Sequence, residues 1–402
     1  MRKLLIVALM FCFISADEFV ESTTTLGGYG ELHWNMEGEE MDFHRFIVFL
    51  NHNFDDRWSL KSEIELEHNM AGDGYDGYIA LEQAYMNYMG NNWDFKGGVV
   101  LAPVGIINPT HEPPTFLSVE RPDYAKYIIP STWFGNGLGF GYKMGDFSFG
   151  LTLMEDIIGA EWADNEICDE NGENCVDVGY NQEGDGAPDT IIGGAMHDTK
   201  YAFRSGRGKG DASYATSLTK IINIGYAGGI EGLKAGFSMV MNDMPHVFDG
   251  DIVEGVESIG LSFNELNVQY NANNIVAVFE TGSGEFDYDA LNTQLENTGD
   301  DKLAKGFEGM RLDLGYNVGS LIGDCDCELY LWTRMTSWDA NTELSTNAKN
   351  GEVSKSLFGV TWKPKNNISF KLETGTMTQE WTEGGGGKNE SDILNFGIGY
   401  MF

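Results

Sequence analysis

Oxygen-bearing side chains alternate with other residues in an acidic stretch near the middle of the chain. Four of them stand at positions 1, 3, 5 and 9 of a segment that has Gly186 at position 6. These four residues are Asn181, Glu183, Asp185 and Asp189. The spacing is the beginning of a calcium-binding loop, in which alternate residues point toward the ion and Gly permits the sharp turn. Position 12 is Ile192 instead of the bidentate Glu, so the segment is not an EF-hand. It predicts either a Ca²⁺ site or a solvated acidic loop.

Four of the cysteines form two close pairs, Cys168 with Cys175 and Cys325 with Cys327. In an exported protein such local pairs are typical of disulfides, although Cys325 and Cys327 could equally be two free thiols. Neither pair has the spacing of a zinc site. The seven His form no catalytic arrangement with Ser and Asp, so the sequence predicts a protein that is not an enzyme.

The charge balance restricts the partners of the chain. Its 402 residues include 62 Asp and Glu but only 25 Lys and Arg, which gives a formal net charge of −37. Nucleic acid is excluded as a partner, because its phosphates must be met by basic residues. With 42% hydrophobic and 12% aromatic residues, the composition is also wrong for an intrinsically disordered chain.

The first residues predict export. A basic pair, Arg2-Lys3, precedes an apolar run from Leu4 to Ile14, and the small residue Ala16 follows. A basic start, a short apolar segment and a small residue at the cleavage position are the parts of a secretory signal peptide. We therefore expect a signal peptide at 1–16 and a mature chain at 17–402.

Alternating apolar and polar residues predict strands along the mature chain. In 58–67, for example, Trp58, Leu60 and Ile64 fall on one face, and charged residues occupy the other. Such alternation indicates β-strands with one apolar and one polar face. No stretch after residue 17 is long enough for a transmembrane helix.

Connection lengths distinguish a membrane barrel from a soluble β-sandwich, because outer-membrane barrels alternate short turns with longer external loops. Seven short turns alternate here with eight longer polar stretches, which run from 35–42 to 379–391 and include the long acidic stretch 155–212. Fifteen connections predict sixteen strands, an even number as single-chain bacterial barrels have. The predicted fold is all-β, a transmembrane antiparallel β-barrel of about 16 strands.

The polar faces of the predicted strands carry charges of both signs. The residues expected to face the lumen include Lys61, Glu63, Glu65, Lys234 and Arg311. Rings of carboxylates favour cations in a pore, and rings of Arg or Lys favour anions. The excess of carboxylates therefore predicts a weak cation preference.

The densest basic cluster of the chain comprises Lys200, Arg204, Arg207 and Lys209. It lies within the predicted external loop 155–212. Its sequence context leaves two interpretations open, a basic patch in the vestibule of the pore and a solvated loop that offsets nearby carboxylates.

The last residues form the most specific local pattern. Leu394, Phe396, Ile398, Tyr400 and Phe402 alternate with small or polar residues, and the chain stops on the aromatic. A closing strand needs a lipid-facing apolar row and an aromatic at the membrane edge. The pattern also resembles the carboxy-terminal aromatic signal of bacterial outer-membrane proteins, which implies the outer membrane of a Gram-negative-type bacterium.

Residues 79–137 contain several short motifs in a distinctive order. They are Leu81-Glu82-Gln83-Ala84-Tyr85, Ala102-Pro103-Val104-Gly105-Ile106, His111-Glu112-Pro113-Pro114-Thr115-Phe116, Val119-Glu120-Arg121-Pro122 and Ile129-Pro130-Ser131-Thr132-Trp133. In this order the stretch resembles the phosphate-selective porin O and P family of outer-membrane channels. The resemblance implies a sixteen-stranded trimeric barrel whose third loop folds inward and narrows the pore.

The segment 102–135 is therefore the predicted constriction. It is rich in Pro, which cannot pair within a sheet and which fixes the backbone at each position, as a fixed aperture requires. The residues predicted to form the constriction are Pro103, His111, Glu112, Pro113, Pro114, Phe116, Glu120, Arg121 and Lys126.

Taken as a whole, the sequence predicts an outer-membrane porin through which small hydrophilic solutes or ions diffuse passively. One alternative is an outer-membrane adhesin or surface-layer barrel whose acidic loops bind calcium and which has no transport role. A second alternative is a secreted soluble β protein. Phosphate selectivity belongs to the resemblance, in which Arg and Lys line the lumen, whereas the carboxylate excess favours cations.

Overall fold

The alternation of apolar and polar residues along each strand corresponds to outward and inward side chains. In β3 (Trp58–Glu67), Ile64 is exposed on the outside, whereas Glu63 and Glu65 are buried on the inside. In β16 (Ile259–Ala272), the exposed Leu266 lies next to the buried Glu265. Inward polar and outward apolar rows are the pattern of a strand in a membrane barrel.

The structure is a computed structural model that describes residues 22–163, 166–167, 176–177, 190–193, 195, 202–211, 213–248, 250–253, 256–289, 305–321, 327–342, 352–381 and 387–402. Several predictions fall outside these residues: the signal peptide at 1–16, the calcium-loop residues Asn181, Glu183, Asp185 and Asp189, and Cys168, Cys175, Cys325 and Lys200. Cys327 is described and forms a disulfide.

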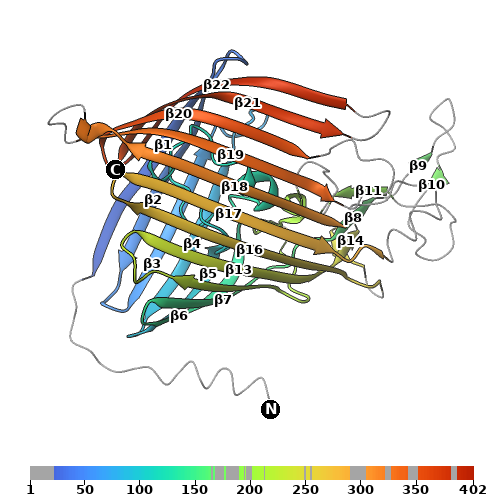
Figure 1. The fold of residues 1–402 in the computed structure, drawn as a ribbon. Helices are drawn as coiled ribbons and strands as arrows, with labels where there is room; N and C mark the ends of the chain where they lie inside the picture. The colour runs from blue at the N-terminus through green and yellow to red at the C-terminus, as the bar shows by residue number, and fades with distance from the viewer. Residues whose placement is uncertain are drawn as a thin grey trace.

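Sixteen antiparallel strands close into one barrel, and their order around it is their order along the chain (Figure 1). The strands are β1 (Thr23–Asn35), β2 (Glu40–Asn53), β3 (Trp58–Glu67), β4 (Ile79–Met89), β5 (Trp93–Leu101), β6 (Phe134–Met144), β7 (Phe147–Met154), β12 (Thr219–Tyr226), β13 (Leu233–Met244), β16 (Ile259–Ala272), β17 (Ile275–Phe286), β18 (Gly306–Asn317), β19 (Glu328–Thr342), β20 (Val353–Lys365), β21 (Ile368–Trp381) and β22 (Gly387–Met401). The predicted sixteen-strand barrel is confirmed.

Shorter elements lie in the connections. A small sheet contains β8 (Ala160–Ala163), β11 (Thr190–Gly193), β14 (His246–Phe248) and β15 (Asp251–Ile252), and β9 (Glu166–Ile167) pairs with β10 (Val176–Asp177). Single helical turns occur at η1 (Pro113–Thr115), η2 (Tyr124–Ile128), η3 (Arg204–Gly206) and η4 (Gly319–Leu321). No helix of the described residues is long and apolar enough to cross a membrane.

Short connections join most of the strands at the barrel end where the C-terminus lies (Figure 1). Asn273 and Asn274, which connect β16 to β17, have φ angles of 54° and 64°. Two successive positive φ angles fit the type I′ turn, which matches the twist of a two-residue hairpin. The predicted turn at 271–274 is thereby confirmed.

The predicted bounds of the last external loop are wrong. The sequence analysis assigned 379–391 to this loop because the stretch is polar, yet β21 continues to Trp381 and β22 begins at Gly387. Gln379 pairs with Asn389 in the ladder. Backbone pairing does not require an apolar face, so the strands extend past the apolar part of the wall.

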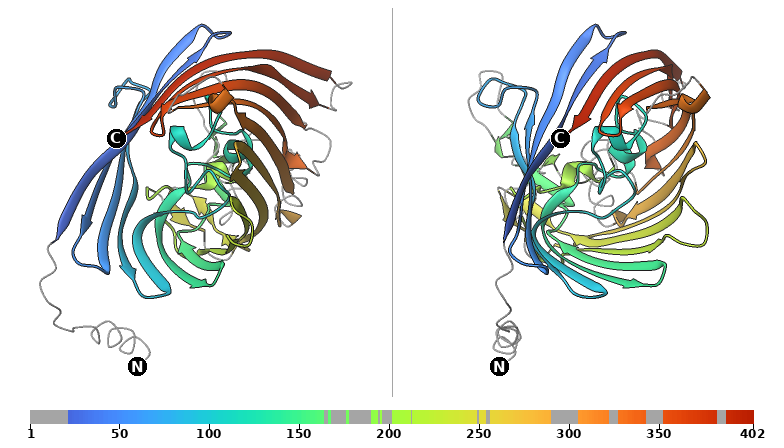
Figure 2. Two further views of the ribbon diagram at one scale, coloured as in Figure 1. Left: turned by 60° about the vertical axis from the view of Figure 1, so that its left-hand side comes forward. Right: turned by 90° about the vertical axis from the view of Figure 1, so that its left-hand side faces the viewer.

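The third long loop folds into the barrel, as predicted. Residues 102–133, called the inward loop below, leave β5 and return to β6 through the interior (Figure 2). Tyr124 and Ile128 of this loop are fully buried, in one cluster with Phe263 and Phe307 of the barrel wall. The interior thus has a hydrophobic core on one side, and that core supports the loop.

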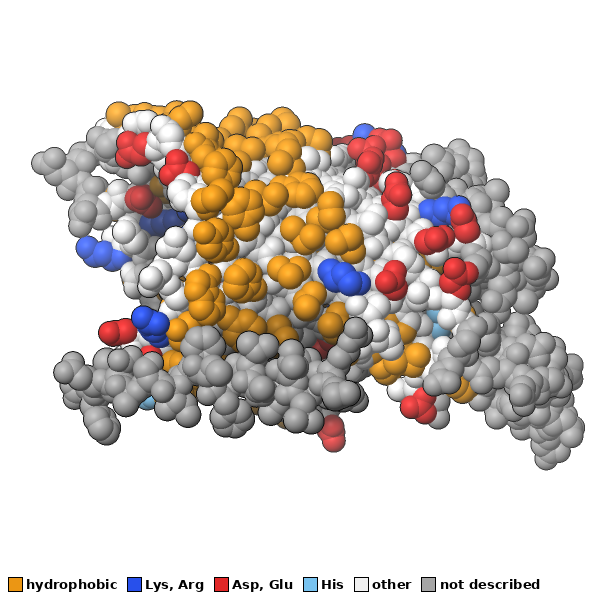
Figure 3. Space-filling model, turned by 90° about the horizontal axis from the view of Figure 1, so that it is seen from below, with side chains coloured by type: hydrophobic (Ala, Val, Ile, Leu, Met, Phe, Trp, Pro, Cys, Tyr) orange, Lys and Arg blue, Asp and Glu red, His pale blue; other side chains and the backbone are white. Residues whose placement is uncertain are grey.

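Hydrophobic side chains gather in a broad belt on the face of the outer wall that Figure 3 shows. Exposed aromatic residues at the turn end of the barrel include Trp93, Phe140, Phe147 and Tyr316. Aromatic girdles at the edges of an apolar band are typical of outer-membrane barrels.

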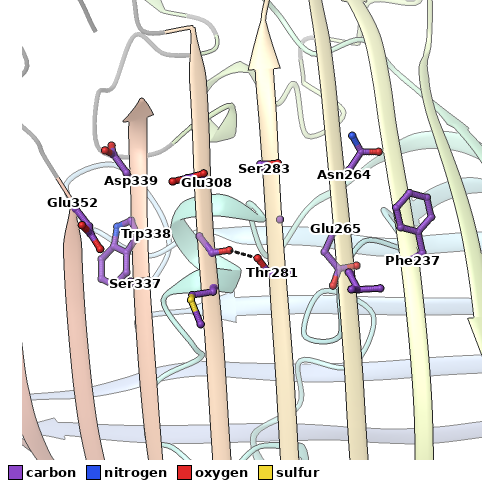
Figure 4. Close-up of a pocket in the computed structure, with 14 residues that line it drawn as sticks. Phe237, Asn264, Glu265, Thr281, Ser283, Glu308, Ser337, Trp338, Asp339 and Glu352 are labelled. Carbon is purple, nitrogen blue, oxygen red and sulfur yellow. Dashed lines mark hydrogen bonds between the residues drawn. The ribbon is translucent and has the colours of Figure 1, made fainter. Parts of the chain in front are cut away.

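A row of polar side chains crosses the outer wall nearer the loop end. The row consists of Asn264, Ser283, Glu308 and Asp339, which pair with one another in register across β16, β17, β18 and β19. Figure 4 shows the four side chains at a similar height on these neighbouring strands. In the rows toward the turn end, apolar residues such as Leu266 and Met310 become frequent.

Candidate pore constriction

Two backbone amides of the inward loop are held by carboxylates of the barrel wall. The Ile106 amide donates to Glu280 Oε1 of β17 at 2.8 Å, and the Val119 amide donates to Glu373 Oε2 of β21 at 2.8 Å. Both carboxylates are buried. A buried loop must find partners for its backbone polar groups, and here the wall supplies them.

Lys371 of β21 binds the same loop through carbonyl groups. Its Nζ donates to the carbonyl oxygens of Pro113 and Ser118, both at 2.7 Å, and lies 4.0 Å from the centre of the Phe116 ring. Such a cation over an aromatic face is attracted by the ring electrons. One buried ammonium group therefore joins three residues of the loop to the wall.

His111 fastens the loop to the opposite part of the wall, at β3 and β4. Its Nδ1 lies 2.9 Å from the Asn108 carbonyl oxygen, and its Nε2 lies 3.3 Å from Glu63 and 3.4 Å from Glu82. Burial and the Arg121 guanidinium act to lower the pKa of His111, but hydrogen bonds to the two carboxylates outweigh both and raise that pKa to about 10. The imidazolium form is thus favoured, and it bridges the two wall carboxylates.

Buried ion pairs keep the inward charges of the wall in place. Arg45 Nε lies 2.7 Å from Glu31, and Arg45 NH1 lies 3.1 Å from Glu65. On β19, Arg334 makes two parallel hydrogen bonds of 2.7 Å to Asp313. The planar guanidinium suits such forked pairing with carboxylates.

An open cavity of about 470 Å³ lies between the inward loop, the wall of β1–β4 and the segment 204–209. Charged side chains of both signs dominate its lining. The carboxylates among the described lining residues are Glu31, Glu67, Glu82, Glu120 and Asp123. The basic residues among them are Arg45, Arg121, Lys126, Arg204, Lys209 and Lys355.

Two ion pairs connect the inward loop to strands across this cavity. Glu120 Oε1 lies 2.8 Å from His33 Nδ1 of β1, and Asp123 Oδ2 lies 3.0 Å from Lys355 Nζ of β20. The loop therefore places charged side chains in the lining of the cavity, and its ion pairs with β1 and β20 help to hold it in position.

The residues predicted for the constriction divide into two groups. Glu120, Arg121 and Lys126 line the cavity. The others anchor or fill the loop: His111, Pro113, Pro114 and Phe116 are buried, Glu112 is half-buried before η1, and Pro103 accepts a hydrogen bond from Asn223. The motif spacing located the loop but did not separate these two roles.

The residues predicted for the lumen lie on inward faces. Glu63 and Glu65 are buried on β3, and Lys61 shares their face. Lys234 lies on the exposed turn-end part of the inward face of β13. Arg311 is buried and pairs with Glu280 at 3.0 Å, so it supports the loop anchor instead of facing open water.

Several residues of the cavity lining were missed by the sequence analysis. Glu31, His33 and Arg45 come from β1 and β2, and Lys355 comes from β20. Glu31 and His33 alternate with outward residues, so a period-two count in 26–34 would have indicated an inward polar row. Arg204 and Lys209 belonged to the predicted basic cluster, and the cavity contact supports its interpretation as a pore-facing patch.

A second cavity, of about 320 Å³, lies beneath the loop along β5–β16. Glycines of β6 make room for it. A Cβ added at Gly139 would approach the Lys96 side chain to 2.7 Å, and one at Gly141 would approach Asp94 to 2.3 Å. These glycines leave space for charged groups on the inner wall.

No family model matches the chain. A protein of Aquifex aeolicus (strain VF5), described as uncharacterized, is 27% identical over 400 residues, which cover 95% of this chain and 81% of that protein. The similarity thus extends over nearly the whole chain, beyond the motifs of 79–137.

Solved structures of bacterial outer-membrane proteins superpose on the barrel. The outer membrane channel DcaP of Acinetobacter baumannii has a TM-score of 0.54 at 11% identity, covering 96% of this chain and 100% of that chain. The anion-selective porin from Comamonas acidovorans has a TM-score of 0.52 at 10% identity, covering 95% and 100%. OmpT of Vibrio cholerae in its trimer form has a TM-score of 0.51 at 12% identity, covering 95% and 99%. These identities support the fold alone, and the chain accordingly has the closed sixteen-strand barrel fold of bacterial outer-membrane porins.

Proposed function

We propose that this protein is an outer-membrane porin that passes small hydrophilic solutes and ions by passive diffusion, with the inward loop as its constriction. The observation that carries the proposal is the division of the barrel interior. The loop is fixed to the wall by buried hydrogen bonds, and charged side chains line an open cavity beside it. A fixed aperture with a charge-lined aqueous path is what a diffusion pore requires.

Selectivity in this proposal is weak and is set by local charge. The described cavity lining has five carboxylates and six basic groups, so it is far more balanced than the whole chain with its net charge of −37. Opposite charges around one aperture orient polar solutes without excluding either sign of ion. The weak cation preference drawn from the carboxylate excess stays a prediction, as does membership of the phosphate-selective porin O and P family, which rests on the motifs of 79–137.

The proposed setting is the outer membrane of a Gram-negative-type bacterium, reached through signal-peptide export, with the lipid in contact with the apolar belt. A homotrimer is the proposed assembly. It is supported by the family resemblance and by the trimer form of the structurally similar OmpT of Vibrio cholerae.

The test is a planar-bilayer recording of the refolded protein under a salt gradient. We expect stepwise single-channel currents and a small zero-current potential of the sign that indicates cation preference. Replacing Glu120 by Gln removes a carboxylate from the cavity, and it should shift this potential toward anions. The matched control is Glu285→Gln, because Glu285 lies on the exposed outer side of β17 and its removal changes the net charge equally.

Absence of stepwise current from a correctly folded barrel would reject the porin and leave the adhesin or surface-layer alternative. A strong anion preference would reject the predicted cation preference. Equal shifts in Glu120→Gln and Glu285→Gln would show that charge at the cavity does not determine selectivity.

A further inference from the structure

Three histidines of this His-poor chain gather at the loop end of β1, β2 and β3. The rings of His33 and His44 are stacked with centroids 4.8 Å apart, and the rings of His44 and His68 meet edge to face at 5.3 Å. The chain has seven His in all, so nearly half of them occupy one corner of the barrel. Of these three rings, only that of His33 contributes to anchoring the inward loop, through its ion pair with Glu120.

Two of these imidazoles converge on one carboxylate. Asp42 Oδ2 lies 2.9 Å from His44 Nδ1 and 2.9 Å from His68 Nδ1. One potential ligand atom from each of the three residues lies within 4.8 Å of the other two. Ligands bound to one metal ion at about 2.0–2.2 Å lie roughly 3 Å apart, and the two distances from Asp42 Oδ2 to the imidazole nitrogens agree with this spacing.

The backbone builds this convergence from local features. Glu31 pairs with Arg45 and His33 pairs with Asp42, so Phe43 and His44 together stand opposite a single residue of β1. Such a bulge redirects side chains and is frequent beside functional sites. On the other side, the His68 amide donates to the His44 carbonyl oxygen at 3.1 Å, which holds the third residue against the first two.

We propose that Asp42, His44 and His68 form a binding site for a divalent transition-metal ion, with Zn²⁺ as the expected occupant. Two imidazoles and one carboxylate suit Zn²⁺, Ni²⁺ or Cu²⁺, whereas Ca²⁺ and Mg²⁺ prefer sets of oxygen ligands. Each imidazole binds through Nδ1 and carries its proton on Nε2. The side chains of His44, Asp42 and His68 are 22%, 35% and 36% exposed, so an ion can enter and water can complete its coordination.

Charges of both signs surround this position. His44 lines the cavity together with Glu31, Glu67 and Glu120. On the basic side, Arg45 pairs with Glu31 and Glu67, and the His33 ring is stacked on that of His44. His44 Nε2 lies 3.8 Å from Glu67 Oε1, which places a carboxylate behind the proposed ligand.

The location links the site to the proposed channel. Since His44 belongs both to the cluster and to the cavity lining, a bound ion adds positive charge at the loop-end mouth of the pore. In a conducting channel, Zn²⁺ added from the loop side should therefore reduce cation current. This second consequence rests on the proposed function, whereas binding itself does not.

Calorimetric titration of the metal-stripped, refolded full chain with Zn²⁺ tests the site. We expect one saturable site with micromolar or tighter affinity and no comparable uptake of Mg²⁺. His44→Ala and His68→Gln should each weaken Zn²⁺ binding on the order of 100-fold. His52→Ala is the matched control. His52 is also on β2, but it lies apart from the cluster and forms a hydrogen bond of 2.8 Å with Thr24. The His52→Ala variant should bind Zn²⁺ with unchanged affinity.

The buried group of Glu63, Glu82 and His111 also has metal-ligand spacing, so His111→Ala is measured in parallel. Loss of Zn²⁺ binding in His111→Ala but not in His44→Ala or His68→Gln would overturn the proposal, as would a wild-type protein without saturable uptake. Heat-dependent gel mobility verifies that each variant is folded. If calorimetry detects the Zn²⁺ site but the refolded wild-type protein shows no stepwise current, the channel proposal fails and the metal-site proposal stands.

Discussion

Lys209 contributes a positive charge to the lining of the cavity beside the inward loop. Its Nζ lies over the rings of Tyr78 and Phe134, at 5.6 Å from each centroid. Burial, followed by repulsion from Arg207 and Arg204, lowers the pKa of Lys209 to about 8. An amino group with that pKa is mostly protonated at pH 7 and mostly deprotonated once the pH exceeds about 8.

We therefore predict that the cation preference of the channel increases as the pH rises through about 8, because the cavity then loses a positive charge. The permeability ratio of cation to anion should rise by a factor on the order of two between about pH 7 and pH 9. Lys209→Gln should show the higher ratio already at neutral pH and little further change. A wild-type ratio that is flat across this range would contradict the prediction. The control is Lys388→Gln, because Lys388 is an exposed residue of β22 that does not line the cavity.

For single residues, the sequence indicated which residue types could line a pore, but it gave little information about which residues contact one another. Glu120, Arg121 and Lys126, which the motif order assigned to the constriction, line the cavity beside the inward loop. The contacts of Lys209 with Tyr78 and Phe134 join segments that are distant in the sequence, and no spacing rule reveals such contacts. The sequence could not decide between the two interpretations of the basic cluster, because the choice depends on where Arg204 and Lys209 lie relative to the cavity.

The inward loop depends on a small number of buried anchors, and His111 is one of the titratable groups among them. Its folded-state pKa of about 10 exceeds the value of about 6.5 expected in an unfolded chain. The stabilisation from the charged form is therefore complete below pH 6.5 or so and is lost as the pH rises through about 10. The contribution of His111 to loop anchoring should therefore weaken only under alkaline conditions.

We predict that His111→Ala loosens the loop at all pH values, because it leaves Glu63 and Glu82 buried without their common partner. Losing one partner of such a buried group costs about 3 kcal/mol. The open-channel current should become noisier in this variant and should no longer respond to a change from about pH 8 to pH 10.5. The wild-type current should become noisier over the same range, and His52→Gln should behave as the wild type does.

The loop illustrates what the sequence can predict about an element. Its position after the fifth strand and its stiffness followed from the loop order and from Pro113, Pro114 and their neighbours. The anchors of the loop could not be predicted in this way. Glu373, for example, accepts a hydrogen bond from the Val119 amide, which is more than 250 residues away in the sequence. Long-range pairing of this kind depends on closure of the barrel, which brings β21 to the first strands.

The last residue takes part in closing the barrel. The Phe402 amide donates to the Gly28 carbonyl at 2.9 Å, and the Gly28 amide donates to the Phe402 carbonyl at 3.1 Å. The Phe402 ring is stacked with Phe46, 6.1 Å between centroids. A Cβ at Gly28 would lie 2.9 Å from that ring, so the absence of a side chain at this position lets the aromatic lie against the wall.

We predict that deletion of Phe402 lowers the yield of closed barrel, because it removes two backbone hydrogen bonds and an aromatic contact worth together about 3 kcal/mol. The measurement is the heat-dependent gel mobility after refolding into detergent micelles. Phe402→Tyr keeps the ring and the backbone, so it should refold normally. An unchanged yield after the deletion would show that the seam between β1 and β22 closes without it.

The number of strands was predictable because it depends on counting turns, and turns have strong local signatures in Gly, Asn and Asp. The ends of the strands were less predictable, as the extended β21 and β22 demonstrate. A strand outside the apolar belt has polar residues on both faces, and its composition then resembles that of a loop.

The polar row of Asn264, Ser283, Glu308 and Asp339 has a consequence for the lipid around the barrel. From Tyr316 to Met310, the outward apolar rows of β18 extend about 20 Å along the strand, or roughly 15 Å perpendicular to the bilayer at the usual tilt, against the ~25 Å band of outer-membrane barrels. On β4, by contrast, Ile79 and Leu81 are exposed near the loop end. The hydrophobic thickness therefore differs around the circumference, and we expect the bilayer to thin beside β16–β19. Each ångström of mismatch costs a fraction of a kcal/mol, so this protein should insert more readily into short-chain lipid than into thick bilayers.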